Sequence, residues 1–257
     1  MKKLLYMLVL LIFTSQLNSS EYSFRKYVHV KEFYKDLVAQ TIEISKKYKL
    51  PPAAILAIAG LESGYGRGYV SQITGNILSL GAFKGDYELP SLYLPYSKSK
   101  QKVLFDPHEI KKHSSYDLTW KKRPKSLKRD YRPASCSGTT DKLELFFYDK
   151  TLNHNAKIAC LNDFATRWIS KNSKVKVFRE TRIWLDKLVS QKGIEILFNI
   201  NTNKEFINRI GGHDYSFNYR DTWPKKAILI MKKVGLTKLT NDIYFKKMSF
   251  DKAWREI

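Results

Sequence analysis

Apolar residues recur at helical spacing along several stretches of this 257-residue chain. Between Glu21 and Leu50 they lie among Lys and Glu, in the pattern of a helix with one buried face. The expected core positions of this helix are Phe33, Leu37, Ile44 and Tyr48. Pro51 and Pro52 interrupt the pattern, and proline fits the first turn of a new helix.

The segment Ala53–Glu62 is apolar on nearly every side, which predicts a buried helix at the centre of the fold. It ends at Ser63-Gly64-Tyr65-Gly66, where two glycines give the backbone the freedom for a sharp exit. Further helices are expected at 108–113, 143–168, 177–188 and 223–234, the last of them the final helix, capped by Gly235. The expected core anchors of these helices are Phe164, Trp168, Trp184 and Leu188.

Two stretches lack helical periodicity. Residues 75–96 are rich in Gly, Pro and aromatic side chains and predict a loop with short strands or a hairpin. Residues 111–132 hold nine Lys and Arg against two Asp and predict a solvated basic loop. The sequence therefore predicts an α+β fold, mostly helical, with a small β-rich lobe and a basic insertion around 111–140.

The first 20 residues have the layout of a secretory signal peptide. Lys2 and Lys3 precede an unbroken apolar run of ten residues, Leu4–Phe13, and a polar stretch follows to Ser20. Ten helical residues rise only about 15 Å, whereas a membrane span needs about 30 Å. We therefore expect residues 1–20 to be a signal peptide and 21–257 to form the mature domain, exported to the periplasm or cell envelope. An uncleaved N-terminal anchor is the alternative.

Export affects what the cysteines and the charge imply. Cys136 and Cys160 are expected to form a disulfide, because exported proteins fold in an oxidising compartment; two buried thiols are the alternative. The chain holds 46 Lys and Arg against 24 Asp and Glu, a net charge of +22. Such a charge attracts anionic envelope polymers, while the expected export disfavours nucleic acid. A merely hydrated basic surface is the simpler interpretation.

Glu62 is the leading candidate for chemistry. It is an acid at the end of an apolar helix, next to glycines that open a groove. Desolvation disfavours a charged carboxylate, so the pKa of Glu62 is expected to be raised. A carboxylic acid that stays protonated near neutral pH is what a glycosidase needs to protonate a leaving oxygen. A glutamate at a helix end is also a common surface residue, and this simpler interpretation stays open.

Residues 57–66, followed by 75–81, resemble the glucosaminidase family, glycoside hydrolase family seventy-three, which includes the flagellar peptidoglycan hydrolase and Bax-like bacterial proteins. The family motif is an apolar helix ending in Glu-Ser-Gly-Trp-Gly, followed by Asn-Leu-Phe-Gly. Tyr65 stands where Trp is usual, Asn76 matches the Asn, and 77–81 departs by an insertion. Fainter likenesses at 105–113 and 210–215 extend the resemblance over residues 50–236, and it is poor between 111 and 176.

The resemblance implies a lysozyme-like fold and hydrolysis of the β-1,4 bond after N-acetylglucosamine in peptidoglycan glycan strands. Glu62 would be the general acid. Glu88 or its neighbour Asp86 would be a second carboxylate that activates water; alternatively these are exposed hairpin charges, or the substrate's own N-acetyl group takes part. Tyr215 would orient the sugar, or would simply pack before a helix. The residues expected to contact substrate are Ser63, Tyr65, Asn76 and Asp86.

Two other functions compete with the hydrolase. A lytic transglycosylase also uses one glutamate after an apolar helix, but the Gly-Leu-Met-Gln-type segment usual in those enzymes is absent. The other is a catalytically silent peptidoglycan-binding envelope protein. No cofactor and no catalytic metal are expected, because the histidines at 108, 113, 154 and 213 lack metal-ligand spacing. The protein is expected to be a monomer.

Overall fold

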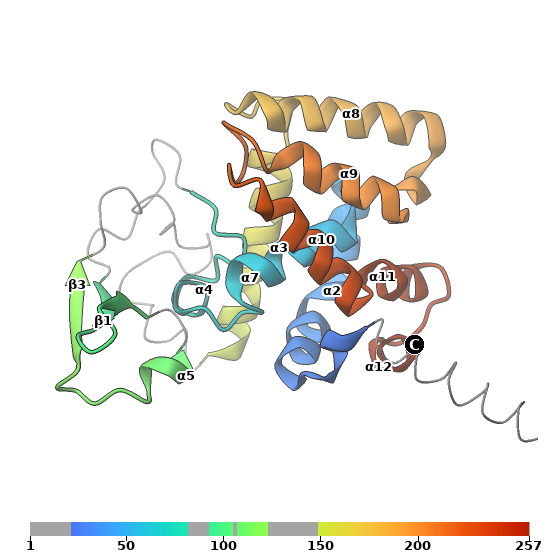
Figure 1. The fold of residues 1–257 in the computed structure, drawn as a ribbon. Helices are drawn as coiled ribbons and strands as arrows, with labels where there is room; N and C mark the ends of the chain where they lie inside the picture. The colour runs from blue at the N-terminus through green and yellow to red at the C-terminus, as the bar shows by residue number, and fades with distance from the viewer. Residues whose placement is uncertain (1–21, 82–92, 105–106, 123–148, 257) are drawn as a thin grey trace, which may run out of the picture. The chain divides into compact units, whose positions relative to one another are not determined.

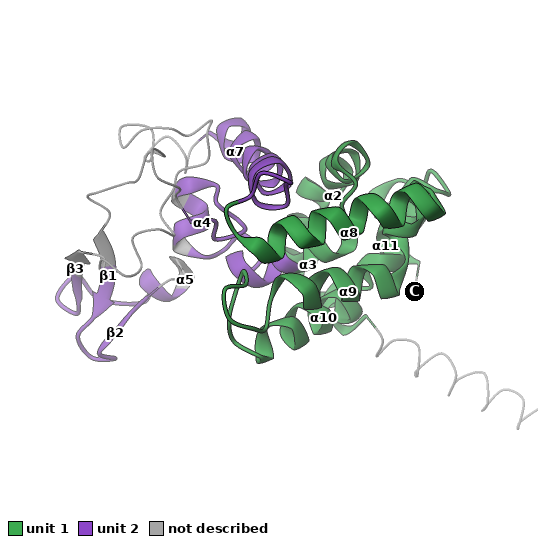
Figure 2. Cartoon of the chain, turned by 90° about the horizontal axis from the view of Figure 1, so that it is seen from above, with its two compact units in different colours: residues 1–57, 174–257 green, residues 58–173 purple. Residues whose placement is uncertain are grey.

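Helices make up most of the described residues of this protein. The computed structural model describes residues 22–81, 93–104, 107–122 and 149–256, and they form helices and one small antiparallel sheet (Figure 1). The chain divides into two compact units (Figure 2). The first comprises Met1–Ala57 and Lys174–Ile257, and the second comprises Ile58–Ser173. The prediction of a mostly helical α+β fold is confirmed.

The described part of the first unit is helical throughout. Its elements are η1 (Ser23–Lys26), α2 (Val28–Tyr48), the start of α3 (Pro52–Ser63), α8 (Lys176–Lys192), η5 (Ile194–Phe198), α9 (Ile200–Ile210), α10 (Thr222–Val234), α11 (Leu236–Tyr244) and α12 (Phe250–Arg255). Helices α8 and α9 lie side by side (Figure 1). Three of the core positions predicted for α2 are buried, and the fourth, Tyr48, is half-buried.

Helix α3 carries the chain from the first unit into the second. Every residue from Ala53 to Ala59 is at most 1% exposed, which confirms the buried helix predicted here. Its first turn is held from α9, because the side chain of Asn203 accepts a hydrogen bond from the Ala54 N–H at 2.8 Å. Packing and this cap fix the axis of α3 along its length.

The C-terminal part of the chain corrects two predictions. Helix α10 ends at Gly235 in the left-handed conformation as expected, but α11 and α12 follow it, so α10 is not the final helix. On α8 the buried stripe consists of Phe178, Thr181, Arg182 and Leu185. Trp184 and Leu188 lie beside that stripe and are only half-buried, so they are not core anchors, whereas Phe164 and Trp168 are buried as expected.

An arginine inside the α8 stripe explains why the sequence pattern was misleading. The guanidinium of Arg182 donates to the carbonyl oxygens of Tyr48 and Lys49, at 2.6 and 3.2 Å, and pairs with Asp186 at 2.9 Å. These bonds join α8 to the end of α2. A charged residue therefore occupies an interior position that hydrophobicity alone would assign to its apolar neighbours.

The second unit combines short helices with a three-stranded sheet. Its other elements are α4 (Tyr69–Thr74), α5 (Pro107–Ile110), α7 (Lys150–Asp163), the π-helical turn η4 (Phe164–Trp168), β1 (Tyr93–Ser97), β2 (Lys102–Val103) and β3 (Leu118–Lys122). The strand order is β2-β1-β3 with antiparallel pairing, and Tyr96 lies opposite both Val103 and Thr119. Strand β1 confirms the expected strand before residue 97.

Strand β3 corrects the basic loop that the charge of residues 111–132 predicts. Leu118, Thr119 and Trp120 are good strand formers, and β3 pairs with β1 along its whole length. The lysines that follow did not prevent strand pairing, so charge density was a poor guide here. Most of the basic insertion, residues 123–140, lies outside the described residues.

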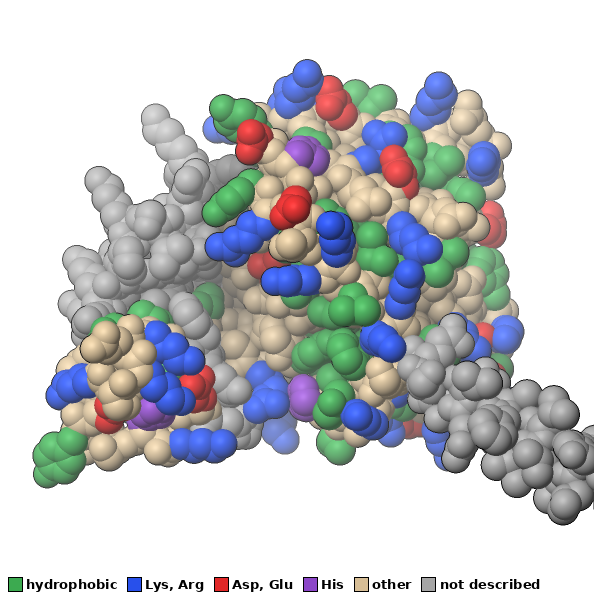
Figure 3. Space-filling model, viewed as in Figure 1, with side chains coloured by type: hydrophobic (Ala, Val, Ile, Leu, Met, Phe, Trp, Pro, Cys, Tyr) green, Lys and Arg blue, Asp and Glu red, His purple; other side chains and the backbone are tan. Residues whose placement is uncertain are grey.

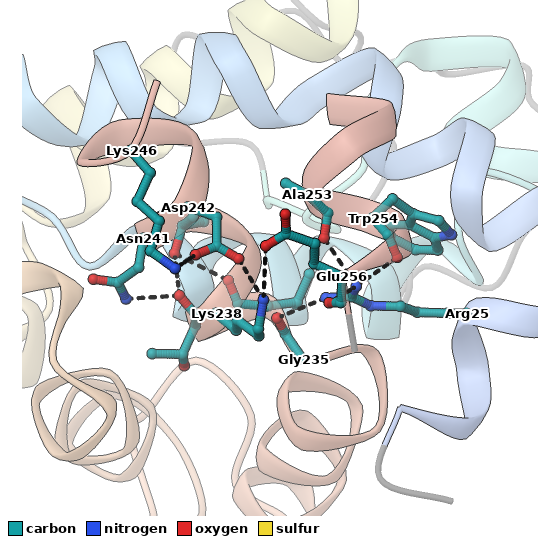
Figure 4. Close-up of polar contacts among 12 residues, drawn as sticks. Arg25, Gly235, Lys238, Asn241, Asp242, Lys246, Ala253, Trp254 and Glu256 are labelled. Atoms are coloured by element: carbon teal, nitrogen blue, oxygen red, sulfur yellow. Dashed lines mark hydrogen bonds and ion pairs between the residues drawn. The ribbon is translucent and has the colours of Figure 1, made fainter. Parts of the chain in front are cut away.

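A single arginine joins the start of the first unit to its end (Figure 4). The guanidinium of Arg25 donates to five backbone carbonyl oxygens, at 2.6–3.4 Å. These acceptors lie where α10 and α12 end: Val234, Gly235, Ala253, Trp254 and Glu256. We call this set the Arg25 junction. Cations suit helix C-termini, where carbonyls lack helical partners and the dipole is negative.

Positive side chains are widely distributed over the surface. On the face shown in Figure 3, Lys and Arg side chains outnumber Asp and Glu. Within the described residues, no helix combines the length and the hydrophobicity needed to cross a membrane.

Candidate active site

Glu62 lies in the last turn of α3, where the helix changes from buried to partly exposed. The apolar residues up to Ala59 are fully buried, while Leu61 and Glu62 are half-buried. The carboxylate therefore extends from a helix that the core holds rigidly. Such a support limits the positions that the acid can adopt, which a proton donor to a bound substrate requires.

Ser63 links the helix to the turn after it. Its hydroxyl donates to the Ala59 carbonyl and accepts from the Gly66 N–H at 2.8 Å, and the side chain is only 2% exposed. This burial does not fit the direct substrate contact expected of Ser63. The residue instead positions the turn beside Glu62.

The turn itself is a run of three left-handed residues. The φ angles are +56° at Gly64, +57° at Tyr65 and +74° at Gly66, which confirms the backbone freedom expected of the two glycines. For Tyr65 the conformation is strained, because its Cβ crowds the following carbonyl at a cost of about 1–2 kcal/mol. Its ring is half-buried, and burial raises the pKa of the Tyr65 hydroxyl to about 12.

The side chain of Asn76 holds together the loop that runs from Asn76 to Leu80. Its side-chain NH₂ donates to the Leu80 carbonyl, and its side-chain oxygen accepts from the Leu80 N–H, both at 2.8 Å. The residue is 2% exposed, and the Cys160 thiol reaches the same oxygen at 3.4 Å. With its amide used inside the protein, Asn76 shapes the loop, and its burial does not fit the direct substrate contact expected of it.

Two residues of the loop connect it to neighbouring elements. The hydroxyl of Ser79 donates a long hydrogen bond of 3.5 Å to the Glu62 carbonyl, and Ser79 has a φ of +49°. At Gly75, with a φ of +66°, an added Cβ would lie 2.3 Å from the Cβ of Ala156 on α7. Sequence patterns did not identify Ser79, because no pattern marks a single left-handed serine.

The other predicted site residues lie outside the described residues or in the other compact unit. Glu88 and Asp86 lie outside the described residues, as does Cys136, so the second carboxylate and the disulfide stay predictions. Tyr215 belongs to the first unit and Glu62 to the second. Tyr215 is 93% exposed with a φ of +58°, so the alternative that it packs as a core aromatic is wrong.

The β-rich lobe holds a polar cluster that sequence reasoning missed. Asp117 accepts from the Ser97 hydroxyl and the Ser99 N–H, each at 2.7 Å, and from the His113 ring. These bonds, that from Ser97 most strongly, hold the pKa of Asp117 well below its usual range. Because its oxygens are engaged by β1 and by the turn before β3, Asp117 braces the lobe. Ser and Asp in a turn are too common to have revealed it.

The described residues contain no group of three or more His, Cys, Asp or Glu placed to hold a metal ion. No family model matches the chain, and none of the curated proteins or solved structures matches it.

Proposed function

We propose that this protein is an exported peptidoglycan hydrolase that cleaves the β-1,4 bond after N-acetylglucosamine, with Glu62 as the general acid. One observation carries the proposal. A half-buried glutamate stands in the last turn of a core helix, three residues before a strained left-handed tyrosine. Backbone strain of this kind persists where the surroundings enforce it, and it concentrates at functional sites.

The turn after Glu62 gives the acid a fixed surrounding. Ser63 locks the helix to the turn, and Asn76 locks the loop whose Ser79 bonds to the backbone of Glu62. Tyr65, three residues after the acid, offers a half-buried ring, and aromatic faces stack well on sugars. A preorganised acid beside an aromatic surface suits protonation of a glycosidic oxygen.

The rest of the mechanism follows the same proposal. Glu88 or Asp86 activates water on the far side of the sugar, or the substrate's N-acetyl group attacks instead. Tyr215 orients the sugar. The net charge of +22 attracts the anionic envelope polymers that surround the glycan strands.

The test is to incubate purified peptidoglycan with the wild-type protein and with Glu62→Gln, and to identify released fragments by mass spectrometry. We expect reducing N-acetylglucosamine ends from the wild type and a rate about 10²–10⁴-fold lower from the variant, the usual contribution of a general acid. The matched control is Glu43→Gln, which removes the same charge from an exposed position on α2 and should cleave normally. The thermal unfolding midpoint of Glu62→Gln should match that of the wild type.

Each of the other possible results supports a different function for this protein. Undiminished cleavage by Glu62→Gln would show that Glu62 is not the general acid. Anhydro-muramic ends assign the chain to the lytic transglycosylases. Binding to sacculi with no released fragments supports the catalytically silent peptidoglycan-binding protein.

A further inference from the structure

Helix α10 presents a row of positive charge on the first unit. Its sequence, TWPKKAILIMKKV, contains four lysines and no acid. Lys225, Lys226 and Lys232 are exposed and Lys233 is half-buried. Within the described part of the chain, no ion pair involves any of the four. The charge of this row is therefore accessible to an external anionic partner.

An apolar side chain lies in the middle of this row. Leu229 is 49% exposed, although the helix buries its other large apolar residues more completely. Residues three and four apart share a helix face, so Lys225 and Lys226 lie one turn before Leu229, and Lys232 and Lys233 one turn after it. We call these five residues the α10 face. Lysines around an exposed leucine are typical of a helix that lies against a lipid surface.

The first described residues of the chain pack against the end of this helix. The Arg25 guanidinium donates to the Val234 carbonyl at 2.7 Å, and Figure 4 shows it reaching Gly235 as well. The ring of Tyr22 packs against Gly235, where an added Cβ would lie 2.6 Å from it. Element η1 thus rests against the last turn of α10.

Element η1 follows the apolar N-terminal run closely in the sequence. Leu4–Phe13 ends nine residues before Tyr22 in the sequence, a distance of at most about 30 Å in an extended chain. Beyond η1, Tyr27 is 44% and Val28 74% exposed. The end of α10 therefore contacts the part of the chain that follows the apolar run in the sequence.

We propose that the α10 face binds the anionic phospholipid surface of a membrane. Its four lysines complement anionic headgroups, and Leu229 reaches the boundary of the acyl chains. This inference does not depend on the role of Glu62, because it concerns only the first unit. Its effect is to hold the protein at a membrane surface, whether or not the N-terminal segment is removed.

The test measures how strongly the full chain prefers anionic vesicles. Co-sedimentation with vesicles of phosphatidylcholine is compared with vesicles that also contain phosphatidylglycerol. The N-terminal run binds both kinds, so the ratio of the two partition coefficients reports on charge. The test variant carries Gln at 225, 226, 232 and 233. The matched control carries Gln in place of four lysines elsewhere in the same unit: Lys174, Lys187, Lys192 and Lys204.

We expect the wild type to prefer anionic vesicles, increasingly so at low salt. Each lysine near such a surface adds roughly fivefold to binding, so the test variant should lose about 10²-fold or more of the preference. The matched control should lose no more than about threefold, because its lysines are not on α10 and do not surround Leu229. Equal losses in both variants, or a wild type without preference, would overturn the proposal.

A second variant separates lipid from polymer. Leu229→Ser should weaken binding to anionic vesicles several-fold and leave binding to polyphosphate unchanged, because only a bilayer accepts an apolar side chain. If Leu229→Ser has no effect on vesicles, or if the four lysines are needed for sacculi but not for vesicles, the α10 face binds an anionic polymer and the membrane proposal fails.

Discussion

The Arg25 junction and the turn after Glu62 both supply hydrogen-bond partners to backbone groups at the ends of helices, and they do so in different ways. At the junction one guanidinium satisfies five carbonyl oxygens, while Lys238 and Lys246 pair with Asp242 nearby (Figure 4). After Glu62 the chain turns through three left-handed residues, one of them a tyrosine, and a serine hydroxyl replaces the missing backbone partner. The junction is stabilised by a charged side chain, whereas the turn contains a strained residue, Tyr65.

This difference indicates what each region is for. Carbonyl oxygens bound by a half-buried guanidinium stabilise the fold but leave little for a ligand to bind. The turn gives up some stability at Tyr65, and it follows a half-buried glutamate and carries a half-buried aromatic ring. Substitutions at the junction should therefore act on stability, and substitutions at the turn should act mainly on activity.

The largest effect on stability is expected from Arg25→Met. Five carbonyls lose their charged donor, and several remain shielded from water, so the free energy of unfolding should fall by about 3–5 kcal/mol. Urea denaturation followed by circular dichroism measures the change. Lys26→Met is the control, because Lys26 is exposed and should change stability by less than about 0.5 kcal/mol. Equal effects of the two variants would show that the junction contributes little.

A smaller loss, about 2–3 kcal/mol, is expected from Gly75→Ala. The new Cβ would combine a left-handed backbone with a contact of 2.3 Å to Ala156. Gly64→Ala is the matched control, since its Cβ would meet only the Gly68 nitrogen at 4.0 Å and should cost about 1 kcal/mol. Denaturant midpoints of both variants test the order, and a larger loss at Gly64 would contradict the steric explanation.

Two carboxylates of the first unit, Asp242 and Asp251, should make stability depend on pH. Burial raises the pKa of Asp242, but hydrogen bonds from Lys238 and Lys246 outweigh it and hold that pKa below its usual value. Hydrogen bonds from Lys31 and Lys35 lower the pKa of Asp251 to about 2. A carboxylate whose pKa is lower when folded stabilises the protein above its unfolded pKa, so stability should fall from about pH 4 towards pH 2.

Asp242→Asn tests which carboxylate is responsible. Its thermal unfolding midpoint should lie below that of the wild type at pH 6 and should fall less steeply between about pH 4 and pH 2. Glu205→Gln, which removes an exposed carboxylate paired with Arg209 on α9, should keep the wild-type pH dependence. A wild-type slope in Asp242→Asn would leave the effect to other acids.

The sequence predicted the apolar part of this structure better than the polar part. Helix α3 was recognisable because seven consecutive residues have no polar side, and α10 because its glycine cap follows an amphipathic run. Strand β3 was hidden by its lysines, and α8 was misread because Arg182 takes a core position. Hydrophobic patterns cannot show where a charged side chain finds enough partners to be buried.

The candidate site shows the same limit. Glu62 and the left-handed glycines were identified from the sequence, since an acid and two glycines after an apolar helix form a local pattern. Ser63 and Asn76 were predicted to contact substrate. The side chain of each instead forms hydrogen bonds to backbone groups within seven residues of it in the chain. The sequence does not distinguish a polar residue that faces a ligand from one that shapes the loop.

The smallest change in stability is expected where strain and burial oppose each other. Tyr65→Gly removes about 1–2 kcal/mol of left-handed strain but also removes a half-buried ring, so the free energy of unfolding should change by less than about 1 kcal/mol. Lys49→Gly is the matched control, because Lys49 caps α2 with a φ of +55° and an exposed side chain. It loses no burial and should gain about 1 kcal/mol.

The two variants should differ further in peptidoglycan cleavage. Tyr65→Gly should lower the rate at least about tenfold, since the ring proposed to stack on the sugar is gone, while Lys49→Gly should cleave at the wild-type rate. If Tyr65→Gly is stabilised as much as Lys49→Gly, the ring contributes nothing to packing. If it also keeps full activity, the strain at Tyr65 serves only to reverse the chain, and the contrast between the turn and the junction disappears.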